Sequence, residues 1–81
     1  MKMTAREMFE KLGYRKTNHL IPPSIGWENK DWETAISFIG NKDKGCRIHI
    51  YPLGDTYQDS GMIGIDEFKA IYKQLEELGW I

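Results

Sequence analysis

Hydrophobic residues recur with two different periods along this chain, and the change of period restricts the fold that the chain can adopt. Near both ends they recur every three or four residues, as they do on one face of a helix. Between residues 32 and 51 they alternate with other residues, as they do in a strand with one buried side. The 81 residues leave room for only one hydrophobic core. The pattern therefore predicts a single α+β domain over residues 1–81.

The first predicted helix covers residues 4–12. Thr4 and Glu7 have the spacing of a capping box, in which each side chain accepts a hydrogen bond from the backbone amide of the other residue. The apolar residues of this segment form one stripe at the spacing i, i+3, i+4 and i+7: Ala5, Met8, Phe9 and Leu12.

The second predicted helix covers residues 65–78. Gly64 is a tolerable N-cap, and Asp66 and Glu67 are favourably placed in the first turn, where the helix dipole stabilises negative charge. The predicted buried stripe, with Tyr72 at its edge, consists of Phe68, Ile71, Leu75 and Leu78.

Both predicted helices end in the same way, with EKLGY at residues 10–14 and EELGW at residues 76–80. Gly13 and Gly79 can adopt the left-handed conformation that ends a helix. In a Schellman ending, the residue after the glycine contacts the residue five positions before it, which pairs Tyr14 with Phe9 and Trp80 with Leu75. The repeat is therefore interpreted as two helix ends and carries no chemistry.

Three strands are predicted at residues 24–28, 32–39 and 45–51. In the second and third strands the even positions form the predicted core face: Trp32, Thr34, Ile36, Phe38, Cys46, Ile48 and Ile50. The polar segment between Gly40 and Gly45 indicates a hairpin. The sequence leaves open whether residues 14–21 add an edge strand. The prediction is a two-layer α-β-β-β-α domain, with a three-stranded antiparallel sheet and both helices on one face.

Composition and charge narrow the class of protein. The 11 basic and 12 acidic residues give a net charge of −1, so no global field attracts nucleic acid or anionic membrane. Cys46 is the only cysteine, which fits a reducing cytosol, and its predicted place is the core. The chain has no apolar run of signal-peptide or membrane-spanning length. These observations predict a cytoplasmic protein without membrane contact.

Residues 56–67 resemble a calcium-binding EF-hand loop only in part. With Glu67 at position 12, Gly61 falls at position 6, but positions 1, 3 and 5 are Thr56, Gln58 and Ser60. A single in-register carboxylate does not replace the hydration of a doubly charged ion. We therefore predict that the segment binds no calcium and that Glu67 serves the start of the last helix.

The sequence contains no recognisable catalytic, metal or cofactor site. Cys46 and His49 differ by an odd number on a strand and so point to opposite faces, and His19 is distant in sequence. Adjacent helical carboxylates, such as Glu76 and Glu77, do not converge on one point. The expectation is that the protein is not an enzyme and needs no cofactor.

Two groups of exposed residues are the candidate binding sites. The face opposite the core presents a possible protein-interaction site, formed by Glu33, Arg47, His49 and Tyr51. The alternative interpretation is that this face is an ordinary solvent-exposed sheet surface without a binding function. A possible basic patch for nucleic acid, the less favoured partner, consists of Arg15, Lys16, Lys42 and Lys44, with Arg47 beside them.

The two ends, MTAREMFEKLGY and IDEFKAIYKQLEELGWI, resemble a group of small uncharacterised proteins encoded by phages and prophages of low-GC Gram-positive bacteria. Members typically open with a Thr-Ala-Arg-Glu helix ending in Leu-Gly-aromatic, and close with a helix ending in Glu-Leu-Gly-Trp. Gly64 stands where these proteins usually have a threonine cap. The resemblance implies an accessory protein of the host cytoplasm with no assigned activity. The expected function is a non-catalytic module, monomeric or weakly dimeric, that binds a host or phage protein.

Overall fold

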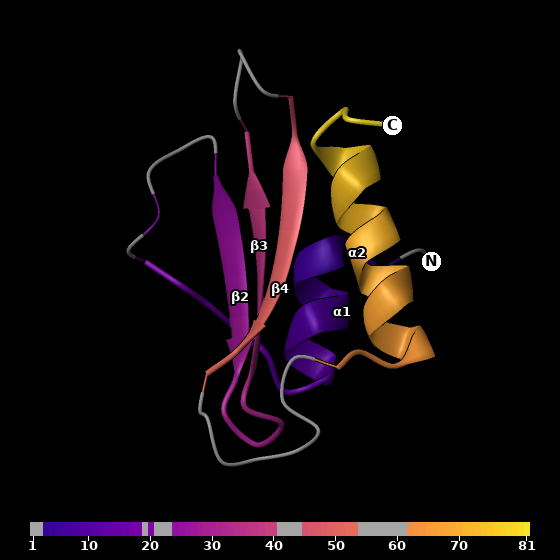
Figure 1. The fold of residues 1–81 in the computed structure, drawn as a ribbon. Coiled ribbons are helices and arrows are strands. Elements are labelled where there is room, and N and C mark those ends of the chain that lie inside the picture. Colours follow the sequence, from indigo (N-terminus) through magenta and orange to yellow (C-terminus); the bar gives the residue numbers. More distant parts are fainter. Residues whose placement is uncertain (1–2, 19, 21–23, 41–44, 54–61) are drawn as a thin grey trace.

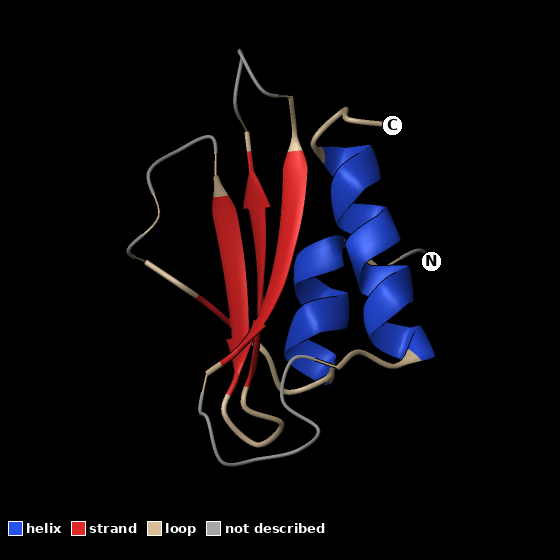
Figure 2. Cartoon of the chain, viewed as in Figure 1, coloured by secondary structure: helices blue, strands red, loops and turns tan. Residues whose placement is uncertain are grey.

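Two helices cover one face of an antiparallel sheet in the computed structural model (Figure 1). The structure describes residues 3–18, 20, 24–40, 45–53 and 62–81. The helices are α1 (Ala5–Lys11) and α2 (Ile65–Glu77), and they run antiparallel beside each other. The strands are β1 (Arg15–Lys16), β2 (Ile25–Asn29), β3 (Thr34–Ile39) and β4 (Arg47–Pro52). Helices and strands form separate layers, as predicted for a two-layer α+β domain (Figure 2).

Both helices begin and end at the residues that the sequence indicates. Thr4 Oγ1 accepts a hydrogen bond from the Glu7 amide at 3.1 Å, and the Glu7 carboxylate accepts one from the Thr4 amide at 2.9 Å. Hydrogen bonding of the Glu7 carboxylate with Thr4 lowers the pKa of Glu7. At the other end, Gly13 has φ +94° and the Tyr14 amide donates to the Phe9 carbonyl at 2.9 Å.

The end of α2 repeats this geometry. Gly79 has φ +75° and the Trp80 amide donates to the Leu75 carbonyl at 3.0 Å. Each glycine thus adopts the left-handed conformation that a Schellman ending requires. The interpretation of the Leu-Gly-aromatic repeat as two helix ends is confirmed.

Glu77 connects the two helices through a contact that the sequence did not reveal. Its carboxylate Oε2 accepts a hydrogen bond of 2.7 Å from the backbone amide of Ala5, in the first turn of α1. The amides of a first turn have no partner within their own helix, so this contact satisfies one of them.

We expect Glu77→Ala to lower the free energy of unfolding by roughly 1 kcal/mol, because it removes a charged acceptor from a helix start. Glu76→Ala is the matched control, since it removes a neighbouring carboxylate and should change stability by no more than about 0.5 kcal/mol. Urea denaturation of the two variants measures the difference. Equal losses would show that the contact contributes nothing to stability.

The sheet has the strand order β1-β2-β3-β4, and each neighbouring pair is antiparallel. Even-numbered residues of β3 and β4 pair with each other, as predicted: Ile36 lies opposite Ile50, and Phe38 lies opposite Ile48. The Leu53 amide donates to the Glu33 carbonyl at 2.8 Å and extends this ladder by one pair.

The described residues form four strands, so the prediction of three is wrong. The additional strand is β1, in which Arg15 lies opposite Glu28 and Lys16 lies opposite Trp27. Both residues of β1 are exposed. A two-residue strand without an apolar side has no alternating pattern, and it forms because the edge of β2 offers free backbone groups.

The core is built around stacked aromatic rings. Phe9 is fully buried, and its ring stacks on Trp27 at a centroid distance of 4.9 Å and an angle of 15°. Tyr14 and Phe38 contact the same ring edge-on, at 5.6 and 6.3 Å. Trp27 Nε1 donates to Gln74 Oε1 at 3.2 Å, which places a polar residue of α2 inside the core.

Three large apolar residues of the predicted core are exposed, contrary to prediction: Trp32, Phe68 and Ile48, the last of which is 40% exposed on the edge strand β4. Trp32 is 55% exposed because β3 begins only at Thr34, so Trp32 lies in the preceding turn, where strand alternation does not apply. Phe68 is 56% exposed, whereas Ala70 and Gln74 are buried. The buried side of α2 is turned toward α1, because Ala70 shares a helix face with Glu77, which binds Ala5.

Tyr14 places its hydroxyl in the core, where the hydroxyl has no hydrogen-bond partner in the structure. Burial, together with the nearby negative charge of Glu67, raises the pKa of Tyr14 to about 12. The folded state therefore holds the phenol proton more tightly than the unfolded chain, in which the pKa of tyrosine is about 10.

The raised pKa of Tyr14 makes the free energy of unfolding decrease at high pH. Below about pH 10 both states are protonated and Tyr14 adds no pH dependence, whereas between about pH 10 and 12 only the unfolded state loses the proton. We expect the free energy of unfolding to fall over this range by roughly 2 kcal/mol more in the wild type than in Tyr14→Phe. Urea denaturation from pH 8 to 12 measures both proteins. Parallel pH profiles would contradict the assignment to Tyr14.

Candidate protein-binding surfaces

Arg47, His49 and Tyr51 lie together on the face of the sheet that the helices leave uncovered. Side chains alternate along a strand, so these residues point away from the helices, while Ile48 and Ile50 point toward them. The rings of His49 and Tyr51 lie 4.6 Å apart at an angle of 35°. Arg47 and His49 are exposed and Tyr51 is half-buried. The structure thus brings together three of the four predicted residues, and we call them the β4 outer patch.

Glu33, the fourth predicted residue, precedes β3 and lies in the turn after β2. Its φ is +48°, in the left-handed region. The Glu33 amide donates to the Lys30 carbonyl at 3.3 Å, and its carbonyl accepts from the Leu53 amide. Glu33 therefore lies at the end of the sheet, and the candidate surface consists of the β4 residues.

The middle of the outer sheet face is built from small residues. Ala35 and Ser37 are 1% and 4% exposed. Ala35 lies between Glu28 and Tyr51 of the neighbouring strands, and Ser37 lies between Gly26 and His49. Next to Ser37, a Cβ at Gly26 would collide with Thr17 Oγ1 and come within 2.7 Å of Leu20 Cδ1. Any larger residue at position 26 would require the side chains of Thr17 and Leu20 to move. The accessible part of this face therefore follows β4 rather than the centre of the sheet.

The predicted basic patch is divided between the two edges of the sheet. Arg15 and Lys16 are exposed on β1, whereas Arg47 is on β4, and two strands separate them. Three strand spacings correspond to roughly 14 Å. Lys42 and Lys44 lie outside the described residues. The described cations therefore form two small groups rather than one continuous path for a phosphate backbone.

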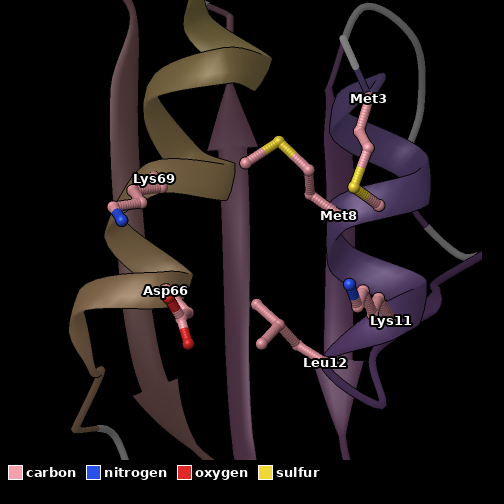
Figure 3. Close-up of a pocket in the computed structure, with 6 residues that line it drawn as sticks. All are labelled: Met3, Met8, Lys11, Leu12, Asp66 and Lys69. Carbon is pink, nitrogen blue, oxygen red and sulfur yellow. The ribbon is translucent and has the colours of Figure 1, made fainter. Parts of the chain in front are cut away.

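A hollow lies between α1 and α2, with the strands behind it (Figure 3). Its volume is about 290 Å³, and its apolar lining consists of Met3, Met8 and Leu12 from the α1 side. A neighbouring hollow shares the two methionines and continues past Tyr72 and Glu76. Methionine side chains adapt easily to different apolar surfaces. The rest of the lining is charged and carries both signs: Lys11, Asp66 and Lys69.

No group of three metal-ligating side chains occurs among the described residues. His19 and the segment 54–61, which includes Thr56, Gln58 and Ser60, lie outside the described residues. Glu67 has the predicted role at the start of α2, because its carboxylate accepts a hydrogen bond of 3.1 Å from the Gly64 amide.

Cys46 is exposed, which contradicts its predicted burial. It lies just before β4, the edge strand, rather than within it.

We expect millimolar calcium to leave the thermal unfolding curve unchanged. A ligand that binds only the folded state at a hundred times its dissociation constant adds about 2.7 kcal/mol, which raises the melting midpoint of a domain this small by roughly 10 °C. Glu67→Gln should cost less than about 1 kcal/mol, since it retains an oxygen acceptor for the Gly64 amide. A midpoint increase of several degrees with calcium, lost in Glu67→Gln, would refute this expectation.

Neither helix that the structure describes has the length and apolar character needed to cross a membrane. Comparison of the chain with protein-family models, curated proteins and solved structures found no match. The resemblance to phage-encoded proteins therefore remains a prediction from the two helical segments.

Proposed function

We propose that this protein is a non-catalytic binding module that presents the β4 outer patch to another protein. The observation that carries the proposal is the ring contact of His49 with Tyr51 beside the exposed Arg47. Tyrosine and arginine are enriched among the residues that dominate the energy of protein interfaces. Their position on a hydrogen-bonded strand fixes the backbone beneath them, so little backbone entropy is lost on binding.

The resemblance of the two helical segments to phage-encoded proteins supports a partner of host or phage origin in the host cytoplasm. A protein partner is favoured over nucleic acid, because the described cations of the predicted basic patch lie at opposite edges of the sheet. Acidic Glu28 also lies directly opposite Arg15 and reduces the local positive charge.

Affinity capture from host lysate, with the tagged wild type and the variants Arg47→Ala and Tyr51→Ala, tests the proposal. Arg15→Ala is the matched control, because it removes an exposed arginine from the opposite edge strand. Loss of an interface hot spot costs about 2 kcal/mol or more, so each patch variant should bind the captured protein roughly 30-fold more weakly. Arg15→Ala should bind it as the wild type does.

Circular dichroism of each variant establishes that the fold is intact. A specific partner that both patch variants retain as well as the wild type would refute the β4 outer patch as the binding site. Binding whose affinity falls steeply with salt, and which nuclease treatment abolishes, would indicate nucleic acid instead.

A further inference from the structure

The outer edge of β4 offers backbone hydrogen-bonding groups with no strand beside them among the described residues. β4 is the last strand in the sheet order. The bond from the Leu53 amide to the Glu33 carbonyl shows that odd-numbered residues of this segment bond to β3. The N–H and C=O groups of Ile48 and Ile50 therefore lie in the plane of the sheet and point away from β3, toward the free edge. Pro52, which has no N–H, has the same orientation at the end of the strand.

The side chains along this edge are also incompletely covered. Ile48 and Ile50 point to the helix side, where β2 and β3 carry the core residues. Ile48 is nevertheless 40% exposed, and Ile50 is only half-buried. Sheet edges are commonly guarded by a bulge or by a charge that points inward. The two inward-pointing residues in the middle of β4 are both isoleucines, so this edge lacks the inward charge.

We propose that β4 pairs antiparallel with β4 of a second copy of this chain, across a two-fold axis at His49, so that the sheet continues through both copies. This register places Ile48 opposite Ile50 of the second copy, and each isoleucine covers the other. On the outer face it places Arg47 opposite Tyr51 of the second copy, where a guanidinium can lie against the ring. The inference rests on the edge of β4 and does not depend on the proposed function.

Charge and hydrogen bonding favour this register over its neighbours. The two Arg47 residues lie four positions apart along the paired strands, roughly 14 Å, so their repulsion is largely screened at physiological salt. The outward groups of Ile48 and Ile50 bond to those of Ile50 and Ile48 of the second copy. A register centred on Ile48 would instead place Arg47 opposite His49 of the second copy. Tyr51 would then lie opposite Gly45 of the second copy, which precedes β4.

Cysteine cross-linking tests the register. His49 would face His49 of the second copy in a non-hydrogen-bonded pair, in which Cα atoms lie about 4.5 Å apart, within the range of a disulfide. The double variant Cys46→Ser/His49→Cys should therefore form mostly covalent dimers under mild oxidation. The wild type should not, because the two Cys46 residues would lie roughly 20 Å apart. Cys46→Ser/Arg15→Cys, with an exposed cysteine on the opposite edge strand, is the second control and should form no covalent dimer.

Sedimentation equilibrium over a concentration series tests the association itself. The 9.5 kDa wild type should reach twice its monomer mass as concentration increases. His49→Lys places two like charges opposite each other on an exposed position and should weaken the dimer at least tenfold. Ile48→Pro removes an outward N–H together with the isoleucine side chain and should abolish the dimer. Circular dichroism verifies the fold of both variants.

A wild type that remains monomeric at millimolar concentration would overturn the inference. A dimer that persists in His49→Lys, or that does not cross-link through His49→Cys, would overturn it as well. A monomer that still captures a partner through Arg47 and Tyr51 would refute only this inference. A dimer of the stated register that captures no partner would refute only the proposed function.

Discussion

Replacing Phe9 with alanine should lower the free energy of unfolding by about 3–5 kcal/mol. Phe9 is fully buried in α1, and its ring contacts Trp27, Tyr14 and Phe38. Removing a buried phenylalanine side chain costs about 3–5 kcal/mol, because transfer energy is lost and a cavity remains. A domain of this size has a free energy of unfolding of roughly 4–12 kcal/mol. The single substitution therefore removes a large part of the total stability.

Phe68→Ala is the matched control for this experiment. It removes the same side chain from the other helix, at a position that is 56% exposed, and should cost no more than about 1 kcal/mol. Urea denaturation followed by circular dichroism, supplemented by the near-ultraviolet signal of the tryptophans, measures both variants. Comparable losses in Phe9→Ala and Phe68→Ala would mean that the aromatic cluster around Phe9 is not the centre of the core.

The predictions that proved correct depend on short stretches of sequence. The capping box of Thr4 and Glu7 and the glycine at the end of each helix involve residues within six positions of each other. The pairing of β3 with β4 follows from alternation alone, since any even-with-even register places Ile36 and Phe38 on the core face. Local chemistry determines these features, so the sequence is sufficient to identify them.

The predictions that failed depend on how the elements pack. Periodicity shows that Phe68 and Ile71 lie near one face of α2. It does not show that packing against α1 shifts the buried face to Ala70 and leaves Phe68 exposed. Likewise, alternation does not indicate that β3 begins only after Trp32. The hydrogen bonds from Trp27 to Gln74 and from Ala5 to Glu77 join residues distant in sequence. Single polar residues leave no periodic signal.

The candidate site was predictable to the extent that it lies on one strand. Alternation along β4 is sufficient to place Arg47, His49 and Tyr51 on one face. Glu33 was grouped with them because the second strand was expected to begin at residue 32, whereas the structure begins β3 at Thr34. The basic residues were grouped by charge, and only the strand order shows that β1 and β4 are opposite edges.

Asn29 is a buried polar residue that neither periodicity nor motif spacing in the sequence indicates. It is 1% exposed at the end of β2. Its Nδ2 donates to the Leu12 carbonyl at 3.0 Å, at the C-cap of α1, where carbonyls lack helical partners. Its Oδ1 accepts from the amides of Asp31 and Trp32, at 2.9 and 3.2 Å, in the turn before β3. One side chain thus joins the first helix to the sheet.

We expect Asn29→Ala to lower the free energy of unfolding by roughly 3 kcal/mol. The substitution removes three partly buried hydrogen bonds, each contributing about 1 kcal/mol, and leaves their backbone groups without this partner. Asn18→Ala, at an exposed asparagine, is the control and should change stability by no more than about 0.5 kcal/mol. Urea denaturation of both variants at neutral pH measures the difference.

Asn29→Asp distinguishes the loss of the donor from the loss of the acceptors. The carboxylate retains both turn hydrogen bonds, but it no longer donates to Leu12 and places negative charge against that carbonyl. Protonation restores a donor, so the deficit of Asn29→Asp relative to the wild type should shrink on acidification. A deficit that is the same at neutral and acid pH would show that the contact with α1 contributes little. Only the turn before β3 would then explain why a buried asparagine stands at this position.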